Sequence, residues 1–186
     1  RIQGLDGRYT QLLRDGFPLY GGFSSGLSIL QIPPLDLQQF EIIKGSSSTL
    51  YGGGAIAGLI NMVSKTPDEE PALDIMLTQT QALGSTANVF YSKRNEKVGI
   101  SLYGSGHYQK VYDPEDDGFS NLPQTTSISF NPKFFYYPSE KTTFWIGLNG
   151  TYDDRIGGDI TKIESGENGI HQYTEENISK RLSSQA

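Results

Sequence analysis

The sequence predicts two parts, a small mixed α/β unit over residues 1–66 and a series of antiparallel β-strands over residues 72–186. Between them, residues 67–71 form a linker in which two prolines flank an acidic run. Before the linker, short apolar segments are separated by glycine turns. After it, apolar and polar residues alternate with a period of two, the pattern of strands that bury one face.

In the first unit, Asp15-Gly16 and Pro33-Pro34 are turn signals, and "DLQQ" after the prolines is compatible with the start of a helical turn. Three glycines, residues 52–54, then separate two apolar runs. They do not fit a phosphate-binding loop, because no Gly-Lys-Ser/Thr follows and the next run has the composition of a strand. We therefore expect Ser46 to cap a brief helical turn through Leu50, after which the glycines let the chain enter a buried strand.

The second part contains four segments of clear alternation and a weaker fifth. The clear ones are "LDIMLTQ", "VGISLYGS", "TSISFNPKFFY" and "TFWIGLNGTY", and the weaker one is "ANVFYS". Each clear segment places aliphatic or aromatic residues on one face and mostly polar or small residues on the other. This part is therefore expected to form the first five to six strands of one antiparallel sheet.

The connections between these segments also alternate in length. Residues 94–97 and 138–141 are tight turns, whereas residues 108–124 and about 152–177 are long polar loops. Short turns at one end and long loops at the other are typical of an outer-membrane β-barrel, and aromatic residues cluster near the tight turn at 134–144, where an interfacial girdle would lie. A soluble β-sandwich with one wet face gives the same alternation, but it seldom has long loops at one end only.

Bulk composition excludes several classes. The net charge of −6 with 19% charged residues argues against a nucleic-acid partner, which needs a basic face. The absence of cysteine excludes disulfides and thiolate metal sites. No apolar run is long enough for a membrane helix, although barrel strands would not show as such a run. Neither end has the features of a natural terminus, so we expect a segment of a longer protein.

Several motifs in the first unit occur in a family order and spacing. They are Asp15-Gly16-x-Pro18, Ile32-Pro33, Glu41-Ile42-x-Lys44-Gly45, Leu50-Tyr51-Gly52, Ala55-Ile56-x-Gly58 and Ile60-Asn61-x-Val63-Ser64-Lys65. This series closely resembles the second half of the plug domain of TonB-dependent outer-membrane receptors. The resemblance assigns Asp15, Gly16, Gly45, Tyr51, Gly52, Gly58 and Asn61 to the structural motif of the plug.

The resemblance implies a fold and a function. The strands after residue 71 would begin a 22-stranded barrel around the plug. Such a receptor binds a scarce ligand (a ferric siderophore, haem, cobalamin or an oligosaccharide) and imports it when TonB pulls on a TonB box, a segment absent from this sequence. It resides in the lipid of the bacterial outer membrane and is not an enzyme, and no cofactor is implied. Its inner wall is polar, and the inward-facing set is expected to be Asp74, Thr78, Ser101, Ser127, Ser129, Asn131, Lys133, Asn149 and Thr151.

The resemblance also implies roles for individual residues. The upward loops of the plug correspond to the stretches around residues 7–9 and 19–23, so the candidate ligand contacts are Arg8, Tyr9, Tyr20 and Phe23. The aromatic rings could stack on a planar ligand or pack against the barrel wall, and Arg8 could pair with an anion. Where the family usually has a basic residue before Glu-Ile, this chain has Gln39-Phe40, so Glu41 and Lys44 remain as candidates for the charged latch between plug and barrel.

Other interpretations stay open at this point. A receptor-like sensor or anchor would share the plug, and a soluble β-rich binding domain would share the alternation. "DPEDDG", Asp113 to Gly118, partly imitates a calcium loop, but Gln124 occupies the position that needs glutamate, so a solvated acidic loop is favoured. His107 and His171 have no second ligand at metal spacing, so no metal site is expected.

Overall fold

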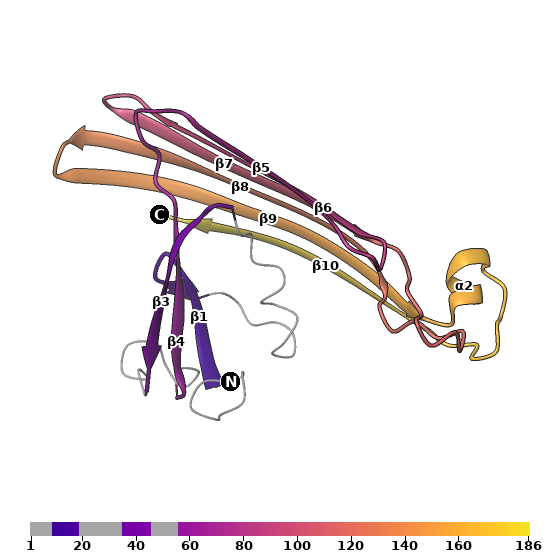
Figure 1. Cartoon of the computed structure of the whole chain (residues 1–186). Coiled ribbons are helices and arrows are strands. Elements are labelled where there is room, and N and C mark those ends of the chain that lie inside the picture. Colours follow the sequence, from indigo (N-terminus) through magenta and orange to yellow (C-terminus); the bar gives the residue numbers. More distant parts are fainter. Residues whose placement is uncertain (1–8, 19–34, 46–55) are drawn as a thin grey trace. The chain divides into compact units, whose positions relative to one another are not determined.

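The computed structural model describes residues 9–18, 35–45 and 56–186, and almost all of their regular structure is β-strand (Figure 1). The chain divides into two units, Arg1–Thr66 and Pro67–Ala186. The described part of the first unit contains strands only. The expected helical turn from Ser46 to Leu50 and the three glycines lie outside the described residues.

The first unit is built on a four-stranded mixed sheet with the order β2-β1-β4-β3. β1 pairs with β2 in antiparallel and with β4 in parallel orientation, and β3 pairs with β4 in antiparallel orientation. The strands are β1 (Thr10–Arg14), β2 (Phe17–Pro18), β3 (Leu37–Lys44) and β4 (Gly58–Ser64). β4 is therefore the central strand that joins the hairpin β1–β2 to β3.

The turn between β1 and β2 consists of Asp15 and Gly16, as the sequence predicts. Their φ angles are 50° and 81°, both in the left-handed region. Asp-Gly is a preferred pair for a two-residue hairpin turn of this kind, because glycine adopts positive φ freely and aspartate tolerates it. The Asp15 N–H also donates to the Met62 carbonyl on β4 at 2.9 Å, which fixes the turn beside the central strand.

The possible helical turn at "DLQQ" is wrong, because β3 begins at Leu37 and continues to Lys44. Pairing with β4 overrides the local preference, and the β-branched Ile42 and Ile43 favour the strand. The approach of β3 requires Gly58, whose φ is 137°. A Cβ there would lie 2.2 Å from the Ile43 carbonyl oxygen, so no other residue fits without moving β3.

The core of the first unit is small and lies over β1 and β4. Leu13, Ala57, Leu59 and Met62 are each at most 2% exposed. Full burial of a leucine or methionine side chain stabilises a fold by about 1.5–3 kcal/mol relative to exposure. These few side chains give the sheet its apolar support.

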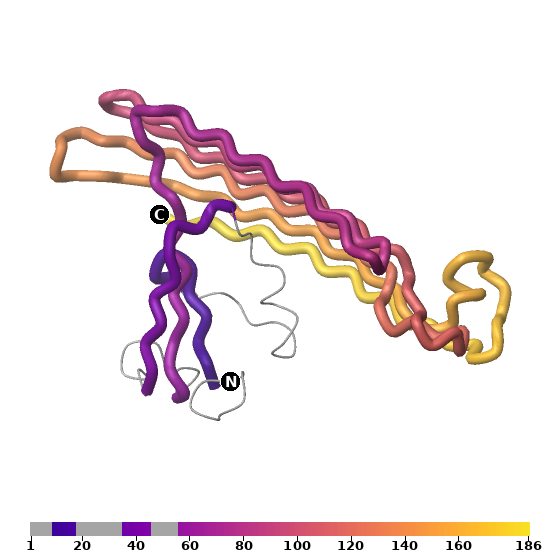
Figure 2. The backbone as a smooth tube through the Cα atoms, viewed as in Figure 1, coloured from indigo at the N-terminus to yellow at the C-terminus, as the bar shows by residue number. Residues whose placement is uncertain are grey.

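The second unit is one antiparallel sheet in which each strand pairs with the next along the chain (Figure 2). Its strands are β5 (Ala72–Gln79), β6 (Gly84–Arg94), β7 (Val98–Gln109), β8 (Gln124–Ser139), β9 (Thr142–Gly158) and β10 (Thr174–Gln185). The weak segment "ANVFYS" is thus part of a full strand, β6.

Both long loops lie at one end of this sheet together with the short β5–β6 connection, residues 80–83, and the two tight turns lie at the other end (Figure 1). β6–β7 and β8–β9 are joined by the tight turns, whereas residues 110–123 and 159–173 form the long loops. The predicted extent of the second long loop, 152–177, is wrong at both ends. Polar residues 153–155 belong to β9 because the backbone ladder to β8 and β10 continues through them.

A short helix in the second long loop, α2 (Ile160–Ser165), was not expected from the sequence. Its N-cap residue is Asp159, and Gly166 ends it in the left-handed conformation. Among the described residues, no helix is long and apolar enough to cross a membrane.

The two faces of the six-stranded sheet differ in chemistry. One face carries large apolar side chains that are about half exposed or more, including Leu73, Ile75, Leu77, Ile128, Phe130, Phe134, Phe144, Ile146 and Leu148. The strand register places every member of the expected inward-facing set on the opposite face. An exposed apolar face of this extent needs an apolar surrounding such as lipid or another protein.

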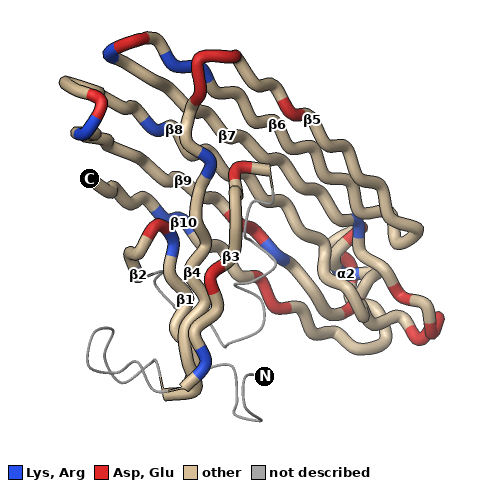
Figure 3. Tube along the Cα trace, turned by 60° about the vertical axis from the view of Figure 1, so that its left-hand side comes forward, with Lys and Arg blue, Asp and Glu red and all other residues tan. Residues whose placement is uncertain are grey.

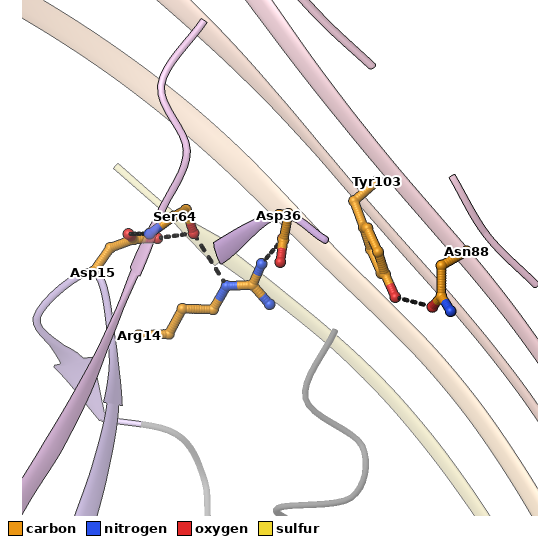
Figure 4. Close-up of polar contacts among 6 residues, drawn as sticks. All are labelled: Arg14, Asp15, Asp36, Ser64, Asn88 and Tyr103. Atoms are coloured by element: carbon orange, nitrogen blue, oxygen red, sulfur yellow. Dashed lines mark hydrogen bonds and ion pairs between the residues drawn. The ribbon is translucent and has the colours of Figure 1, made fainter. Parts of the chain in front are cut away.

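The polar face is packed more tightly. Phe90 and Tyr103 lie opposite each other on β6 and β7 and are 2% and 1% exposed. The Tyr103 hydroxyl donates to Asn88 Oδ1 at 2.7 Å (Figure 4). Near the tight turns, the Arg94 guanidinium lies 3.9 Å from the centre of the Tyr137 ring.

Candidate functional site

A connected set of polar side chains links the β1–β2 turn to β4 (Figure 4). Asp15 accepts two hydrogen bonds from Ser64, one from its backbone N–H at 2.8 Å and one from its hydroxyl at 2.9 Å. Arg14 donates to the Ser64 hydroxyl oxygen at 3.4 Å and forms an ion pair with Asp36. The Arg14 and Asp36 side chains are only 5% and 6% exposed, so the pair is shielded from water.

A second branch of this network reaches β3. The Gly16 N–H donates to Asn61 Oδ1 at 2.9 Å, and Asn61 Nδ2 donates to Glu41 Oε2 at 2.8 Å. Gln39 Nε2 donates to the other carboxylate oxygen of Glu41 at 3.0 Å. Asn61 therefore bridges the hairpin turn and β3 from its place on the central strand.

We name these two branches together the turn network: Arg14, Asp15, Gly16, Asp36, Gln39, Glu41, Asn61 and Ser64. Its side chains bond mainly to one another and to the backbone of the same sheet. Five of its members belong to the motifs that carry the family resemblance: Asp15, Gly16, Glu41, Asn61 and Ser64. The network holds three strands and a turn in one arrangement, which is a positioning role.

The two latch candidates lie on the same strand but do not share a face. Glu41 and Lys44 are three residues apart on β3, and side chains so spaced point to opposite sides of a sheet. Both residues are exposed, and the Glu41 carboxylate already accepts the two hydrogen bonds of the turn network. A latch role for either residue stays a prediction.

The remaining predicted residues of the first unit are placed only in part. Tyr9 is half-buried just before β1, and its carbonyl accepts the Ala57 N–H at 2.9 Å. Gly45 follows β3 and donates its N–H to the Ala57 carbonyl at 3.2 Å. The other predicted residues lie outside the described ones, namely Arg8, Tyr20, Phe23, Tyr51 and Gly52.

The two long loops of the second unit interlock, which the sequence did not predict. The Ser120 N–H donates to the Gly158 carbonyl at 2.9 Å, and the Gly158 N–H donates to Ser120 Oγ at 2.7 Å. The Ile160 N–H donates to the Gly118 carbonyl at 3.1 Å. These bonds run from the 110–123 loop to the end of β9 and the start of the 159–173 loop.

His171 adds a side-chain contact between the same two loops. Its Nε2 lies 2.9 Å from the Asp117 carbonyl oxygen, and its ring packs edge-on against Phe119 with 5.3 Å between the ring centres. The other histidine, His107, lies on β7 with its Nδ1 2.8 Å from Thr86 Oγ1. Both rings thus have hydrogen-bonding partners within the second unit.

Asp159 organises the 159–173 loop from within. Its side chain is 1% exposed and accepts three backbone N–H groups, from Lys162 at 3.0 Å, His171 at 2.8 Å and Gln172 at 2.9 Å. Burial alone would raise the pKa of this carboxyl, but the three hydrogen bonds and the nearby His171 together hold the pKa below its usual value. The carboxylate is therefore kept ionised, and it binds both ends of the loop.

The acidic stretch 113–118 has a different organisation from a calcium loop. Asp113 uses its carboxylate on its own turn, where it accepts the N–H groups of Glu115 at 3.0 Å, Asp116 at 2.9 Å and Gly118 at 2.9 Å. Figure 3 marks the acidic residues of this loop in red. Within the described part of the chain, no group of three or more His, Asp or Glu side chains is arranged to hold a metal ion.

A shallow hollow of about 280 Å³ lies where the two long loops meet the ends of β9 and β10. Phe119 and Tyr173 line it from different loops, and Gly158 at the end of β9 lines it as well. Four polar residues also line it: Ser120, Arg155, Glu175 and Asn177. We call this site the loop hollow.

Comparisons with known proteins agree with this geometry. The family model "TonB-dependent Receptor Plug Domain" matches residues 1–59. The chain is 22% identical over 172 residues to the vitamin B12 transporter BtuB of Photobacterium profundum, covering 88% of this chain and 28% of that protein. It is 27% identical over 154 residues to the ferrichrome outer membrane transporter/phage receptor of Escherichia coli, covering 76% of this chain and 20% of that protein.

Solved structures share the fold. The siderophore receptor PirA from Pseudomonas aeruginosa matches with a TM-score of 0.64 at 17% identity, over 84% of this chain and 30% of that one. The chain thus spans less than a third of the length of these relatives. Taken together, the comparisons show a match to the TonB-dependent receptor plug domain in residues 1–59 and a similarity of most of the chain to outer-membrane transporters and receptors.

Proposed function

We propose that this chain is part of a TonB-dependent outer-membrane receptor that binds a scarce ligand and imports it into the periplasm. In this proposal, residues 1–66 are the second half of the plug. Residues 72–186 supply the first strands of a 22-stranded barrel with its outer loops. The ligand classes are those of the family: ferric siderophore, haem, cobalamin or oligosaccharide.

The observation that carries the proposal is the combination of a plug match with a sheet of two unlike faces directly after it. A membrane barrel needs apolar residues toward lipid and polar residues toward its lumen. The separation is clear over β5 to β9, whereas β10 and the end of β9 near the long loops also carry Glu176, Lys180 and Asp154 on the apolar face. The long loops lie at one end only. A soluble sandwich would instead need a second layer over the apolar face.

Transport in this proposal is a gated binding event with no covalent chemistry. TonB pulls on a segment upstream of residue 1, and the plug then rearranges within the lumen. The wall offered by β5–β10 carries serine, threonine, asparagine and lysine side chains, including Ser101, Ser129, Asn131 and Lys133. Hydrogen bonds and water at such a wall can exchange partners, so a plug held this way opens at lower cost than an apolar core.

The turn network has a definite place in this mechanism. It joins the hairpin turn, β4 and β3 through side chains, so these parts would move as one piece when the plug is pulled. Rearrangement would then begin in segments outside this network. Glu41 and Lys44 are the proposed latch residues toward the barrel, and Tyr9, with Arg8, Tyr20 and Phe23, is a proposed ligand contact.

Uptake by cells tests the proposal. The full-length receptor is produced in a bacterial strain that lacks its own ferrichrome and cobalamin receptors. Radiolabelled ferrichrome and cyanocobalamin are then supplied, with a TonB-deficient strain as the control. We expect TonB-dependent uptake of one of the two ligands. If neither is taken up, we expect the amount of receptor in its native cells to rise under starvation for iron, cobalamin or a glycan. TonB-independent uptake, or production that responds to none of these, would contradict the proposal.

A further inference from the structure

The loop hollow has walls from two loops that are far apart in the sequence. Phe119 comes from the 110–123 loop and Tyr173 from the 159–173 loop, and both line the same space. Their side chains are 37% and 55% exposed, although neither lies on the apolar face of the sheet. Partly exposed aromatic rings that line one small hollow can stack on a flat or cyclic group.

The polar groups of the hollow offer hydrogen bonds without an unpaired positive charge. Arg155 is paired with Asp153, with 2.6 Å between Nε and Oδ1. Glu175 accepts the Tyr173 hydroxyl at 2.9 Å. Asn177 adds an amide, which can both donate and accept. With Arg155 neutralised and Glu175 present, an anionic group would meet repulsion, whereas hydroxyl groups would find donors and acceptors.

Asp159 contacts the backbone of both segments that carry the aromatic walls. It binds the N–H groups of His171 and Gln172, directly before Tyr173. Its backbone N–H donates to the Tyr173 carbonyl at 2.7 Å, and Asp159 also forms a β-bridge with Phe119. The residue between β9 and α2 is therefore in contact with both wall segments.

We propose that the loop hollow is a subsite for an uncharged ring that carries hydroxyl groups, and that Asp159 is the positioning residue that holds its two aromatic walls. The volume of about 280 Å³ fits one ring-sized group and not a whole siderophore or cobalamin. The subsite would thus take a part of the cargo. This inference rests on the proposed receptor function and adds the chemistry of one contact.

Ring binding is tested directly on the full-length receptor in lipid nanodiscs by saturation-transfer NMR. The probes are methyl α-glucopyranoside, catechol and benzoate. We expect saturation transfer to the glucoside, to catechol or to both, and little to the anionic benzoate. The glucoside alone would assign a sugar ring, and catechol alone an aromatic diol. Binding of neither, or stronger binding of benzoate, would overturn the proposal.

Substitutions test whether the probes bind in the loop hollow. Phe119→Ala removes one wall and should weaken binding of the responsive probe about two- to tenfold, the range for one aromatic contact. The matched control is Ile170→Ala, which removes an 87% exposed side chain from the neighbouring loop and does not line the hollow. Equal binding by Phe119→Ala and the parent receptor would overturn the assignment of the site.

Hydrogen exchange tests the positioning role without any ligand. Asp159→Asn keeps the shape of the side chain, but both oxygens of Asp159 accept N–H groups, so the amide NH₂ must face a donor. We expect faster exchange at residues 118–120 as well as 171–173. Faster exchange confined to 160–173 would show that Asp159 does not hold the first wall. Neither measurement needs TonB, so their failure is distinguishable from failure of uptake.

Discussion

At the scale of single residues, the first unit depends most on a buried charge pair. Arg14 and Asp36 are both about 4% exposed and are separated by 22 residues in the chain. Replacing Arg14 with methionine would remove the guanidinium that pairs with the Asp36 carboxylate in a site shielded from water. Breaking such a pair from one side typically costs about 3–5 kcal/mol.

We therefore expect Arg14→Met to lower the hydrogen-exchange protection of β1 and β4 in the full-length receptor by orders of magnitude, while the protection of β7 and β8 stays unchanged. The double variant Arg14→Met, Asp36→Leu should recover part of the loss, because it removes both charges. An Arg14→Met receptor with normal protection of β1 would show that the pair contributes little to the sheet.

Asp159 makes the stability of the 159–173 loop depend on pH, and the lowered pKa gives the sign of this dependence. Because its pKa is lower in the folded loop than in an unfolded chain, the ionised carboxylate stabilises the loop above the ordinary aspartate pKa of about 3.9. That stabilisation is lost as the pH falls through the lowered pKa. Above about pH 5, the loop should be insensitive to pH through this group.

The measurement is the mobility of a nitroxide label on Glu167→Cys, an exposed position in the same loop. This chain contains no other cysteine. We expect the label to become mobile only below about pH 4 in the parent receptor. In Asp159→Asn it should already be mobile at neutral pH. A label with the same pH profile in both proteins would contradict a role for Asp159.

At the scale of strands, the sequence predicted which side chains lie on each face of the β5–β10 sheet, but it did not predict where the strands end. Alternation predicted the sides of the sheet correctly, from Asp74 on β5 to Thr151 on β9. It misplaced the end of β9, because the polar run 153–155 has the composition of a loop although its backbone continues the ladder. Backbone hydrogen bonds do not depend on side-chain polarity, so composition alone could not locate where pairing stops.

The residues of the turn network could be predicted only where the local backbone conformation or a family motif requires a particular residue type. Asp15 and Gly16 could be identified because their turn needs positive φ, and Asn61 because it lies in a family motif. The contacts of Arg14 with Asp36 and of Asp15 with Ser64 join residues 22 and 49 positions apart, and nothing local in the sequence marks them. The contacts between the 110–123 and 159–173 loops were not predicted either, because they also join residues far apart in the sequence.

The two faces of β9 give a matched pair of substitutions. Ile146 lies on the apolar face and is 53% exposed, whereas Asn149 lies on the polar face. If the apolar face contacts lipid, Ile146→Lys should destabilise the folded receptor by about 1–2 kcal/mol, because Ile146 lies between the aromatic cluster at the tight turn and the middle of the membrane. Asn149→Lys should change the stability by less than about 1 kcal/mol.

Urea titration of the receptor folded into lipid vesicles measures both free energies of unfolding. The comparison is internal, since the two positions are three residues apart on one strand and gain the same side chain. Equal costs at the two positions would contradict the assignment of the faces to lipid and lumen.

At the scale of the whole molecule, the second unit is an open sheet with more apolar surface than a water-soluble protein tolerates. Its first and last strands, β5 and β10, each pair on one side only among the described residues. Leu73, Ile75 and Leu77 on β5 are 62–76% exposed, next to an unpaired row of backbone groups. Open edges and exposed apolar faces both promote association between chains.

The 186-residue chain by itself should therefore self-associate in detergent-free buffer. Static light scattering should give a mass well above the 20.5 kDa of one chain, and detergent should reduce this mass because it covers the apolar face. Lysine substitutions at Ile75 and Leu77 should reduce it as well, since charges on an edge strand oppose pairing. A well-folded monomer of 20.5 kDa without detergent would mean that other parts of the chain cover both the face and the edges. Such a result would contradict both this prediction and the proposal that the apolar face is the lipid-facing wall of a barrel.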